Sequence, residues 1–111
     1  MARPRTFFML LAATRHWREL GPAERREVFD ATLAIVFDGF PDLRMSHYAA
    51  GEFDARCSDV IVWQAGDVAQ YHAAIALLRR EAFFGAPLFE IVEVIAGVED
   101  DEFEDDAALA W

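Results

Sequence analysis

The stretch from Leu43 to Asp67 places the strongest constraint on the fold of this chain. It reads as two extended segments joined by a short polar link at 54–56. The second segment contains Val-Ile-Val-Trp at 60–63, and residues of these types favour β-strands. Two such segments separated by a polar link predict a hairpin. A helix-like and a strand-like segment lie on each side of it, so we expect this hairpin to form the centre of a sheet.

The flanking segments supply the remaining strands and the helices. Residues 6–14 are apolar at both alternating sets of positions, which predicts a strand buried on both faces. Apolar residues recur every three or four positions over 28–40 and over 68–82, which predicts two amphipathic helices. Glycines and prolines end both helices, and Asp67 is a good N-cap for the second. The predicted strands span 6–14, 43–53, 57–64 and 89–95.

The order strand, helix, strand, strand, helix, strand predicts a ferredoxin-like βαββαβ fold of the α+β class. Right-handed crossovers then give a four-stranded antiparallel sheet with both helices on one face. The other face would expose a large apolar surface, which soluble proteins avoid. We therefore expect two sheets to pack together in a C2 homodimer, an assembly of the dimeric α/β-barrel type.

The length of 111 residues predicts one domain, and 55% of the residues are hydrophobic. Seven of the eight residues in 99–106 are acidic, whereas the other 103 residues carry 13 acids and 10 bases. We therefore expect a single domain over 1–98 and an acidic tail over 99–111. A chain with a net charge of −10 and no basic stripe is not expected to bind nucleic acid. No stretch approaches the roughly 20 apolar residues of a membrane span.

Cysteine content and the N-terminus bear on the compartment. Cys57 is the only cysteine, so no internal disulfide can form, which fits the reducing cytoplasm. Two early arginines precede a short apolar run at 7–13, a pattern shared with the core of a secretory signal peptide. The fold needs a first strand at this position, so we interpret the run as a strand and expect a cytoplasmic protein.

Several segments resemble the darcynin family of small bacterial proteins. They are FFMLLAATRHWREL, ERREVFDATL, ARCSDVIVW, FFGAPLFEIVEVIAGVED and the acidic end, and together they span nearly the whole chain. The family is functionally uncharacterised, so the resemblance implies a ferredoxin-like α+β domain without a settled reaction. More distantly, the architecture is similar to the dimeric α/β-barrel superfamily, which includes cofactor-free monooxygenases, small isomerases and haem proteins. That similarity concerns the fold and does not assign a function.

The hairpin carries the first candidate site residues. His47 and Tyr48 are adjacent in a predicted strand, so their side chains point to opposite faces. His47 is a candidate general base, with a hydrogen-bonded core histidine as the alternative. Cys57, Asp59 and Trp63 share one face of the next predicted strand. If the two strands pair, His47 lies opposite this row.

That row leaves two interpretations open. A Cys-His-Asp constellation would serve nucleophilic catalysis. In the alternative, Cys57 is a small buried apolar residue, and Asp59 forms an ion pair with Arg56 or caps the turn. The spacings HxH, HxxxH and CxxC are absent, and so are GxGxxG, Walker and GxSxG motifs. The sequence therefore predicts no metal site, nucleotide site or bound cofactor, and haem held by a single histidine stays an open alternative that no motif supports.

The second predicted helix and the end of the first strand add further candidates. Tyr71 belongs to the apolar helix face, and His72 lies beside it. We expect His72 and His47 to line a pocket between the sheet and the helices, with Trp17 at its mouth.

Three functions fit these residues. The first is a protein that binds an apolar or aromatic small molecule in an aromatic-lined cleft, with binding residues Trp17, Trp63, Cys57 and Asp59. The second is a cofactor-independent monooxygenase, isomerase or cyclase, with proton-handling residues His47, His72, Tyr48 and Tyr71. The third is a structural homodimer without a small-molecule site.

Overall fold

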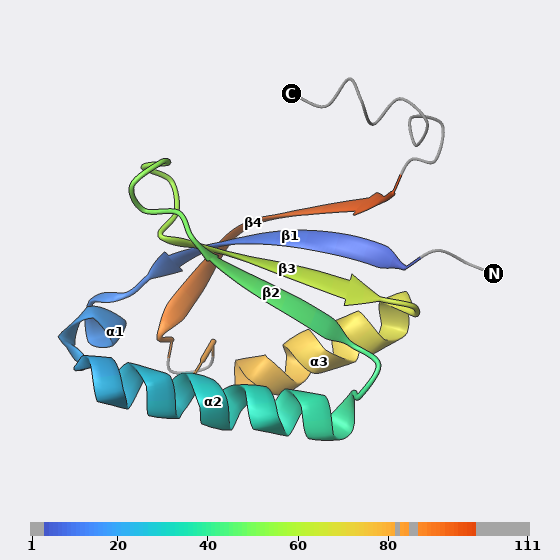
Figure 1. The fold of residues 1–111 in the computed structure, drawn as a ribbon, viewed down its shortest axis with the longest axis horizontal. Helices are drawn as coiled ribbons and strands as arrows, with labels where there is room; N and C mark the ends of the chain where they lie inside the picture. Colours follow the sequence, from blue (N-terminus) through green and yellow to red (C-terminus); the bar gives the residue numbers. More distant parts are fainter. Residues whose placement is uncertain (1–3, 82, 85–86, 100–111) are drawn as a thin grey trace.

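A computed structural model describes residues 4–81, 83–84 and 87–99. In chain order its elements are β1 Arg5–Ala13, α1 Arg15–Glu19, α2 Pro22–Gly39, β2 Arg44–Ala49, β3 Asp59–Ala65, α3 Val68–Arg80 and β4 Phe89–Val98. The strands form one sheet in the order β2-β3-β1-β4, and all neighbouring strands are antiparallel. Helices α2 and α3 lie on the same face of this sheet (Figure 1). The predicted α+β ferredoxin-like fold is confirmed, with α1 as a short addition.

Some predicted element boundaries are wrong. The second strand was expected to reach Phe53, but β2 ends at Ala49 because the chain turns just beyond it. The backbone N–H groups of Phe53 and Asp54 both donate to the carbonyl of Ala50. The last strand was expected to end at Ile95, but β4 continues to Val98, because Gly97 still pairs with Thr6 of β1.

The core lies between the sheet and the two long helices. The central strands place fully buried side chains there in register, with Phe7 opposite Trp63 and Met9 opposite Ile61. Helix α3 completes this layer with an apolar stripe that includes Tyr71, whose ring stacks on Phe7 with centroids 3.7 Å apart. Burial of large aromatic and aliphatic side chains supplies most of the stabilising free energy of such a domain. This packing fixes β1 and β3 as the rigid base on which the site is built.

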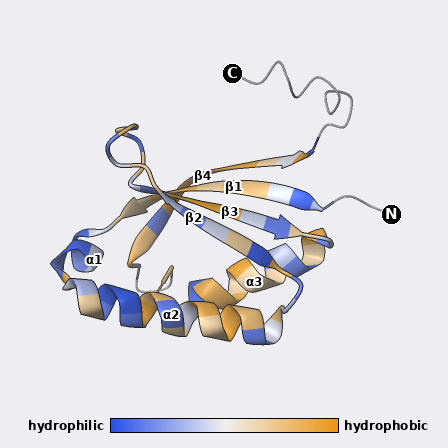
Figure 2. Ribbon diagram, viewed as in Figure 1, coloured by the Kyte–Doolittle hydropathy of each residue, from blue (hydrophilic) through white to orange (hydrophobic). Residues whose placement is uncertain are grey.

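The sheet face opposite the helices is apolar and open. Phe8, Tyr48 and Ile95 point to this side and are 42%, 57% and 53% exposed. Figure 2 shows hydrophobic stretches along β1 and β4. The prediction that β1 is buried on both faces therefore holds in part within the described chain. On the helix side Phe7, Met9 and Leu11 are buried, whereas on the other side Leu10 is buried and Phe8 stays partly exposed.

Two further predictions concern the chain ends and the membrane. Most of the acidic tail predicted over 99–111 lies outside the described residues. Among the helices that the structure describes, none combines the length and apolar character needed to cross a membrane.

Candidate functional site

A histidine and a carboxylate meet on the helix-facing side of the β2–β3 hairpin. In the β2–β3 register, His47 lies opposite Ile61 and Asp59 lies opposite Ala49, so His47 and Asp59 are diagonal neighbours. The distance from His47 Nε2 to Asp59 Oδ2 is 2.6 Å. The two strands do pair, which was the condition for His47 to lie opposite the row that contains Asp59.

The expected ion pair between Asp59 and Arg56 is wrong. Arg56 pairs with Asp54 at 2.9 Å and lies 3.8 Å from Glu93. The reason is local, since the turn brings Asp54 back onto the backbone N–H of Arg56 at 2.8 Å. Asp59 therefore contacts His47 and makes no ion pair with Arg56.

A serine anchors this pair to the centre of the sheet. The hydroxyl of Ser58 donates to Asp59 Oδ1 at 2.6 Å, and the backbone N–H of Ala13 in β1 donates to Ser58 Oγ at 2.8 Å. Both oxygens of the Asp59 carboxylate are thus engaged, and its side chain is only 16% exposed. Burial acts to raise the pKa of Asp59, but the hydrogen bonds from His47 and Ser58 outweigh it and hold the pKa below its ordinary value.

The ionised carboxylate sets the tautomer of the histidine. An ionised Asp59 can only accept hydrogen bonds, so His47 Nε2 must carry the proton in this contact. In the neutral ring, Nδ1 is then the free acceptor. A carboxylate that fixes an imidazole in this way leaves the other nitrogen ready to take a proton from a bound molecule.

His47 lines a pocket of about 310 Å³ between α1, the first half of α2 and β2. The other lining residues are Trp17, Arg25, Arg26, Phe29 and Asp30. The Phe29 and His47 rings are tilted, with centroids 5.2 Å apart. The pocket therefore combines aromatic walls with charged groups and one hydrogen-bonded histidine.

Helix α1 positions the tryptophan of this pocket. It begins at Thr14, whose side chain accepts a hydrogen bond from the backbone N–H of Trp17 and donates to the carbonyl of Leu88 at 3.0 Å. The Trp17 ring packs against Phe89 at 4.6 Å. Trp17 is therefore held by contacts to the start of β4.

Arg25 joins α1 to α2. Its Nε and Nη2 groups donate to the carbonyls of Trp17 and Arg18, at 3.2 and 3.0 Å. Its guanidinium carbon also lies 5.7 Å from the centre of the Trp17 ring, within cation–π range. These contacts fix a guanidinium at the edge of the pocket, since the last carbonyls of a helix are favourable partners for a cation.

The other predicted site residues lie outside the lining of this pocket. Tyr48 is on the open sheet face, as its strand position predicts, and His72 is exposed on α3. Tyr71 is buried in the core, which raises the pKa of its hydroxyl. Trp63 is also buried there, and its Nε1 has no hydrogen-bond partner among the described residues. Cys57 is buried in the link between β2 and β3.

The structure therefore brings His47, Asp59 and Trp17 to one place. It adds three contributors that the sequence reasoning did not single out: Ser58, Arg25 and Phe29. A polar residue directly before Asp59 was a usable signal for Ser58. Arg25 and Phe29 read as parts of an ordinary amphipathic helix.

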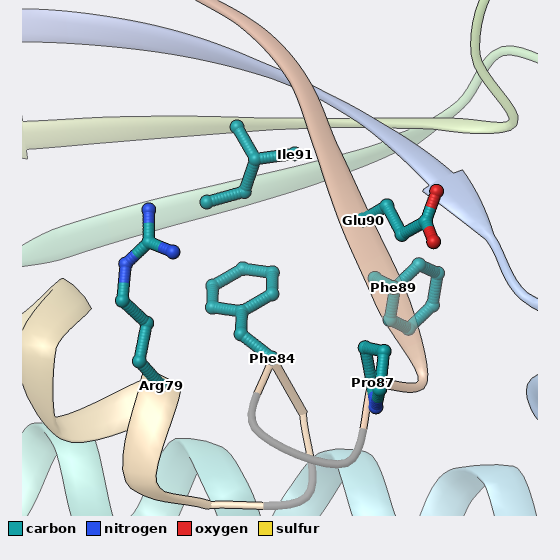
Figure 3. A pocket seen from close by; sticks show the side chains of 6 residues that line it. All are labelled: Arg79, Phe84, Pro87, Phe89, Glu90 and Ile91. Atoms are coloured by element: carbon teal, nitrogen blue, oxygen red, sulfur yellow. The ribbon is translucent and has the colours of Figure 1, made fainter.

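A second pocket, of about 350 Å³, lies beside the start of β4. Its lining residues are Arg79, Phe84, Pro87, Phe89, Glu90 and Ile91. Figure 3 shows the charged ends of Arg79 and Glu90 at opposite sides of this row. Within the described ranges, no group of three or more His, Cys, Asp or Glu side chains is placed to hold a metal ion.

The low pKa of Asp59 makes a testable contribution to stability. Because its pKa is lower in the folded chain than the ordinary value of 3.8, this contribution is complete above about pH 4 and is lost as pH falls through the folded-state pKa. We expect Asp59→Asn to be less stable at pH 7 by about 1–2 kcal/mol. The difference should shrink toward about pH 2.

Urea unfolding followed by circular dichroism at several pH values measures this difference. Asp38→Asn, which changes an exposed carboxylate on α2, is the control and should follow the wild type at every pH. Parallel pH profiles for wild type and Asp59→Asn would contradict the role given to the Asp59 contacts.

Known structures share this fold. A haem-binding protein from Thermus thermophilus superposes with a TM-score of 0.76 at 16% identity, over 100% of this chain and 46% of that chain. A mutant chlorite dismutase from Candidatus Nitrospira defluvii superposes with a TM-score of 0.75 at 14% identity, over 97% of this chain and 46% of that chain. The chain thus spans about half the length of these proteins, and at such identities the likeness concerns the fold alone.

Proteins found by sequence share a higher identity with this chain than these structures do. A darcynin from Chromobacterium violaceum is 36% identical over 75 residues, 68% of this chain and 95% of that protein. Darcynin 1 from Acinetobacter baumannii is 30% identical over 82 residues, 73% of this chain and 91% of that protein. The family model for darcynin, described as a domain of unknown function, matches residues 1–106. This chain therefore belongs to the darcynin family.

Proposed function

We propose that this protein binds a small molecule with an apolar or aromatic body in the pocket between α1, α2 and β2. The observation that carries the proposal is the lining itself, in which Trp17 and Phe29 form apolar walls and His47 and Arg25 are held by hydrogen bonds. Ligand sites typically combine apolar walls with a few fixed polar groups in a volume of about 300–1,000 Å³. The pocket lies at the lower end of that range, which favours a small ligand.

Haem is one ligand to consider, because one structural neighbour is a haem-binding protein. Of the histidines in the described part, only His47 lines a described pocket, and its Nε2 is engaged by Asp59. Its other nitrogen, Nδ1, is the ring nitrogen nearer the backbone. A haem bound through Nδ1 would therefore clash with β2, the strand that carries His47. The residues present do not fit haem ligation at this pocket, so a smaller organic ligand is the better match.

A second candidate function is cofactor-independent catalysis of the kind carried out by monooxygenases, isomerases or cyclases. The contact between His47 and Asp59 favours it, because the carboxylate holds the imidazole in the tautomer whose Nδ1 can accept a proton. The carboxylate would also stabilise the imidazolium that forms. In this reading Asp59 orients the base, and Trp17 and Phe29 hold the substrate beside it.

We also propose that the protein pairs with a second copy of itself through the open sheet face. Phe8, Tyr48 and Ile95 give this face an apolar character that a lone chain leaves in water. The structural neighbours support the proposal, since their chains are about twice as long and have room for a second unit of this size. A C2 dimer would supply that unit from an identical chain.

We place this function in the cytoplasm. The proposal rests on Cys57, a single buried thiol without a disulfide partner. A homodimer whose pocket takes no ligand would instead be a structural protein, which is the third candidate.

Binding can be located by NMR. In a titration of ¹⁵N-labelled protein with indole and with 2-naphthol, we expect backbone shift changes at Trp17, Phe29 and His47. These residues line the pocket, whereas Arg79 and Ile91 in the second pocket serve as internal controls. Changes gathered around the second pocket, or no changes with either compound, would contradict the assigned site.

Catalysis can be separated from binding at His47. Compounds that bind are incubated with the protein in air and followed by mass spectrometry. We expect His47→Gln to slow any conversion by about 100-fold or more, because the proton acceptor is lost, while affinity changes little. His72→Gln is the comparison, since His72 is exposed on α3 and should leave the rate unchanged. Equal rates in the wild type and His47→Gln would remove the basis of this candidate.

The dimer is tested by sedimentation equilibrium. We expect a dimer at micromolar concentration, and we expect Phe8→Lys to weaken it at least about tenfold because a charge would enter an apolar interface. Ile35→Lys is a matched control, since Ile35 has the same 42% exposure but lies on α2. A wild-type protein that is monomeric at this concentration would show that the sheet face is not an interface between copies.

A further inference from the structure

The charge of Arg25 is not paired with a carboxylate in the described part of the chain. Its two hydrogen bonds go to the neutral carbonyls of Trp17 and Arg18, the first partly buried and the second exposed, and Arg25 as a whole is half-buried. A guanidinium has five N–H donors, so three are left over. A guanidinium that is partly removed from water gains from an anionic partner, because desolvation of a charge costs free energy.

The neighbouring acids are occupied elsewhere. On α1, Glu19 pairs with Arg15 at 3.0 Å. On α2, Asp30 lies 3.9 Å from Arg26, and Glu24 accepts from the backbone N–H of Gly21.

The remaining acid near the pocket is on β3. Both oxygens of Asp59 are engaged by His47 and Ser58, and Asp59 is not among the residues that line the pocket. Its charge acts on Arg25 from a distance, as the electrostatic effect of Arg25 on the pKa of Asp59 shows. Among the residues that the structure describes, the pocket surface thus presents one fixed cation, Arg25, that no carboxylate contacts.

We propose that the ligand of this pocket is an arene carboxylate, whose carboxylate pairs with Arg25 while its ring lies against Trp17 and Phe29. This inference rests on the proposed function and adds the chemical class of the ligand. A planar guanidinium matches a carboxylate in a two-point contact. Trp17 and Phe29 supply the apolar surface for the ring next to it.

A monovalent carboxylate fits better than a phosphate. One fixed guanidinium offers one fork, and the pocket also contains Asp30 with Asp59 nearby. A second negative charge on the ligand would meet these carboxylates, in a protein whose net charge is already −10. Arg26 adds little, because its side chain is 84% exposed and lies beside Asp30.

Calorimetric titrations with matched pairs of compounds test the proposal. The probes are benzoate, 2-naphthoate and indole-3-acetate, each compared with its own primary amide, which keeps the ring and removes the charge. We expect at least one acid to bind the wild type about tenfold or more tightly than its amide. In Arg25→Gln this preference should fall to near unity, whereas Arg26→Gln should retain most of it.

Two further measurements distinguish an effect of the guanidinium from a loss of folding. Arg25→Lys preserves the charge without the planar fork, so the preference should be intermediate, and the acid should bind more weakly as salt is added. Thermal unfolding checks that each variant is folded, because Arg25 also connects α1 to α2.

The outcomes separate the two proposals. If acids and amides bind the wild type equally, or if Arg25→Gln keeps the preference, the carboxylate proposal is wrong while binding in the pocket stands. If no acid, amide or neutral arene binds the folded wild type, the proposed binding function is wrong and the carboxylate proposal falls with it.

Discussion

The candidate site depends on the pairing of β3 between β1 and β2. This register sets Asp59 diagonally across from His47 and brings Ser58 against the backbone of β1. A shift of one residue would turn Asp59 to the open face and end both contacts. Core packing on the helix side opposes such a shift, because the same register buries Ile61 and Trp63. Stability and site geometry therefore have the same origin.

The hairpin was predictable from sequence because its signal is local. Alternation and β-favouring residues predicted the two strands and the shared face of Asp59 and Trp63, whereas the register that sets His47 opposite this row required the fold and the length of the link was misjudged. The role of Arg25 was not predictable, because it depends on the angle at which the chain passes from α1 into α2. A helix of five residues has almost no periodic signal, and a charged residue in the first turns of a helix ordinarily reads as solvated. The role of Ser58 was predictable in part. Its position beside Asp59 is evident in the sequence, but its hydrogen bond with the backbone N–H of Ala13 depends on the pairing of β1 with β3.

The two faces of the sheet differ in how far the described chain covers them. On the helix side, the domain completes its own core and leaves the candidate pocket where α1 and the first half of α2 meet β2, apart from the second pocket beside the start of β4. On the other side, Phe8, Tyr48 and Ile95 stay partly exposed in the described chain. The pocket is therefore formed by one chain, and a second copy on the open face would leave its opening free. Binding and self-association can on this basis operate in the same assembly without competing for surface.

The strand β2 nevertheless links the two faces. His47 and Tyr48 are consecutive, so one side chain reaches the pocket while the next lies on the open face, 57% exposed. β2 is also an edge strand, held to the sheet by β3 alone, so it has fewer constraints than the central strands. Covering Tyr48 in a dimer would restrain this edge strand and with it the position of His47 against Asp59. The physical consequence is that dimer formation would order the pocket as well as bury the sheet, without contributing a residue to the lining.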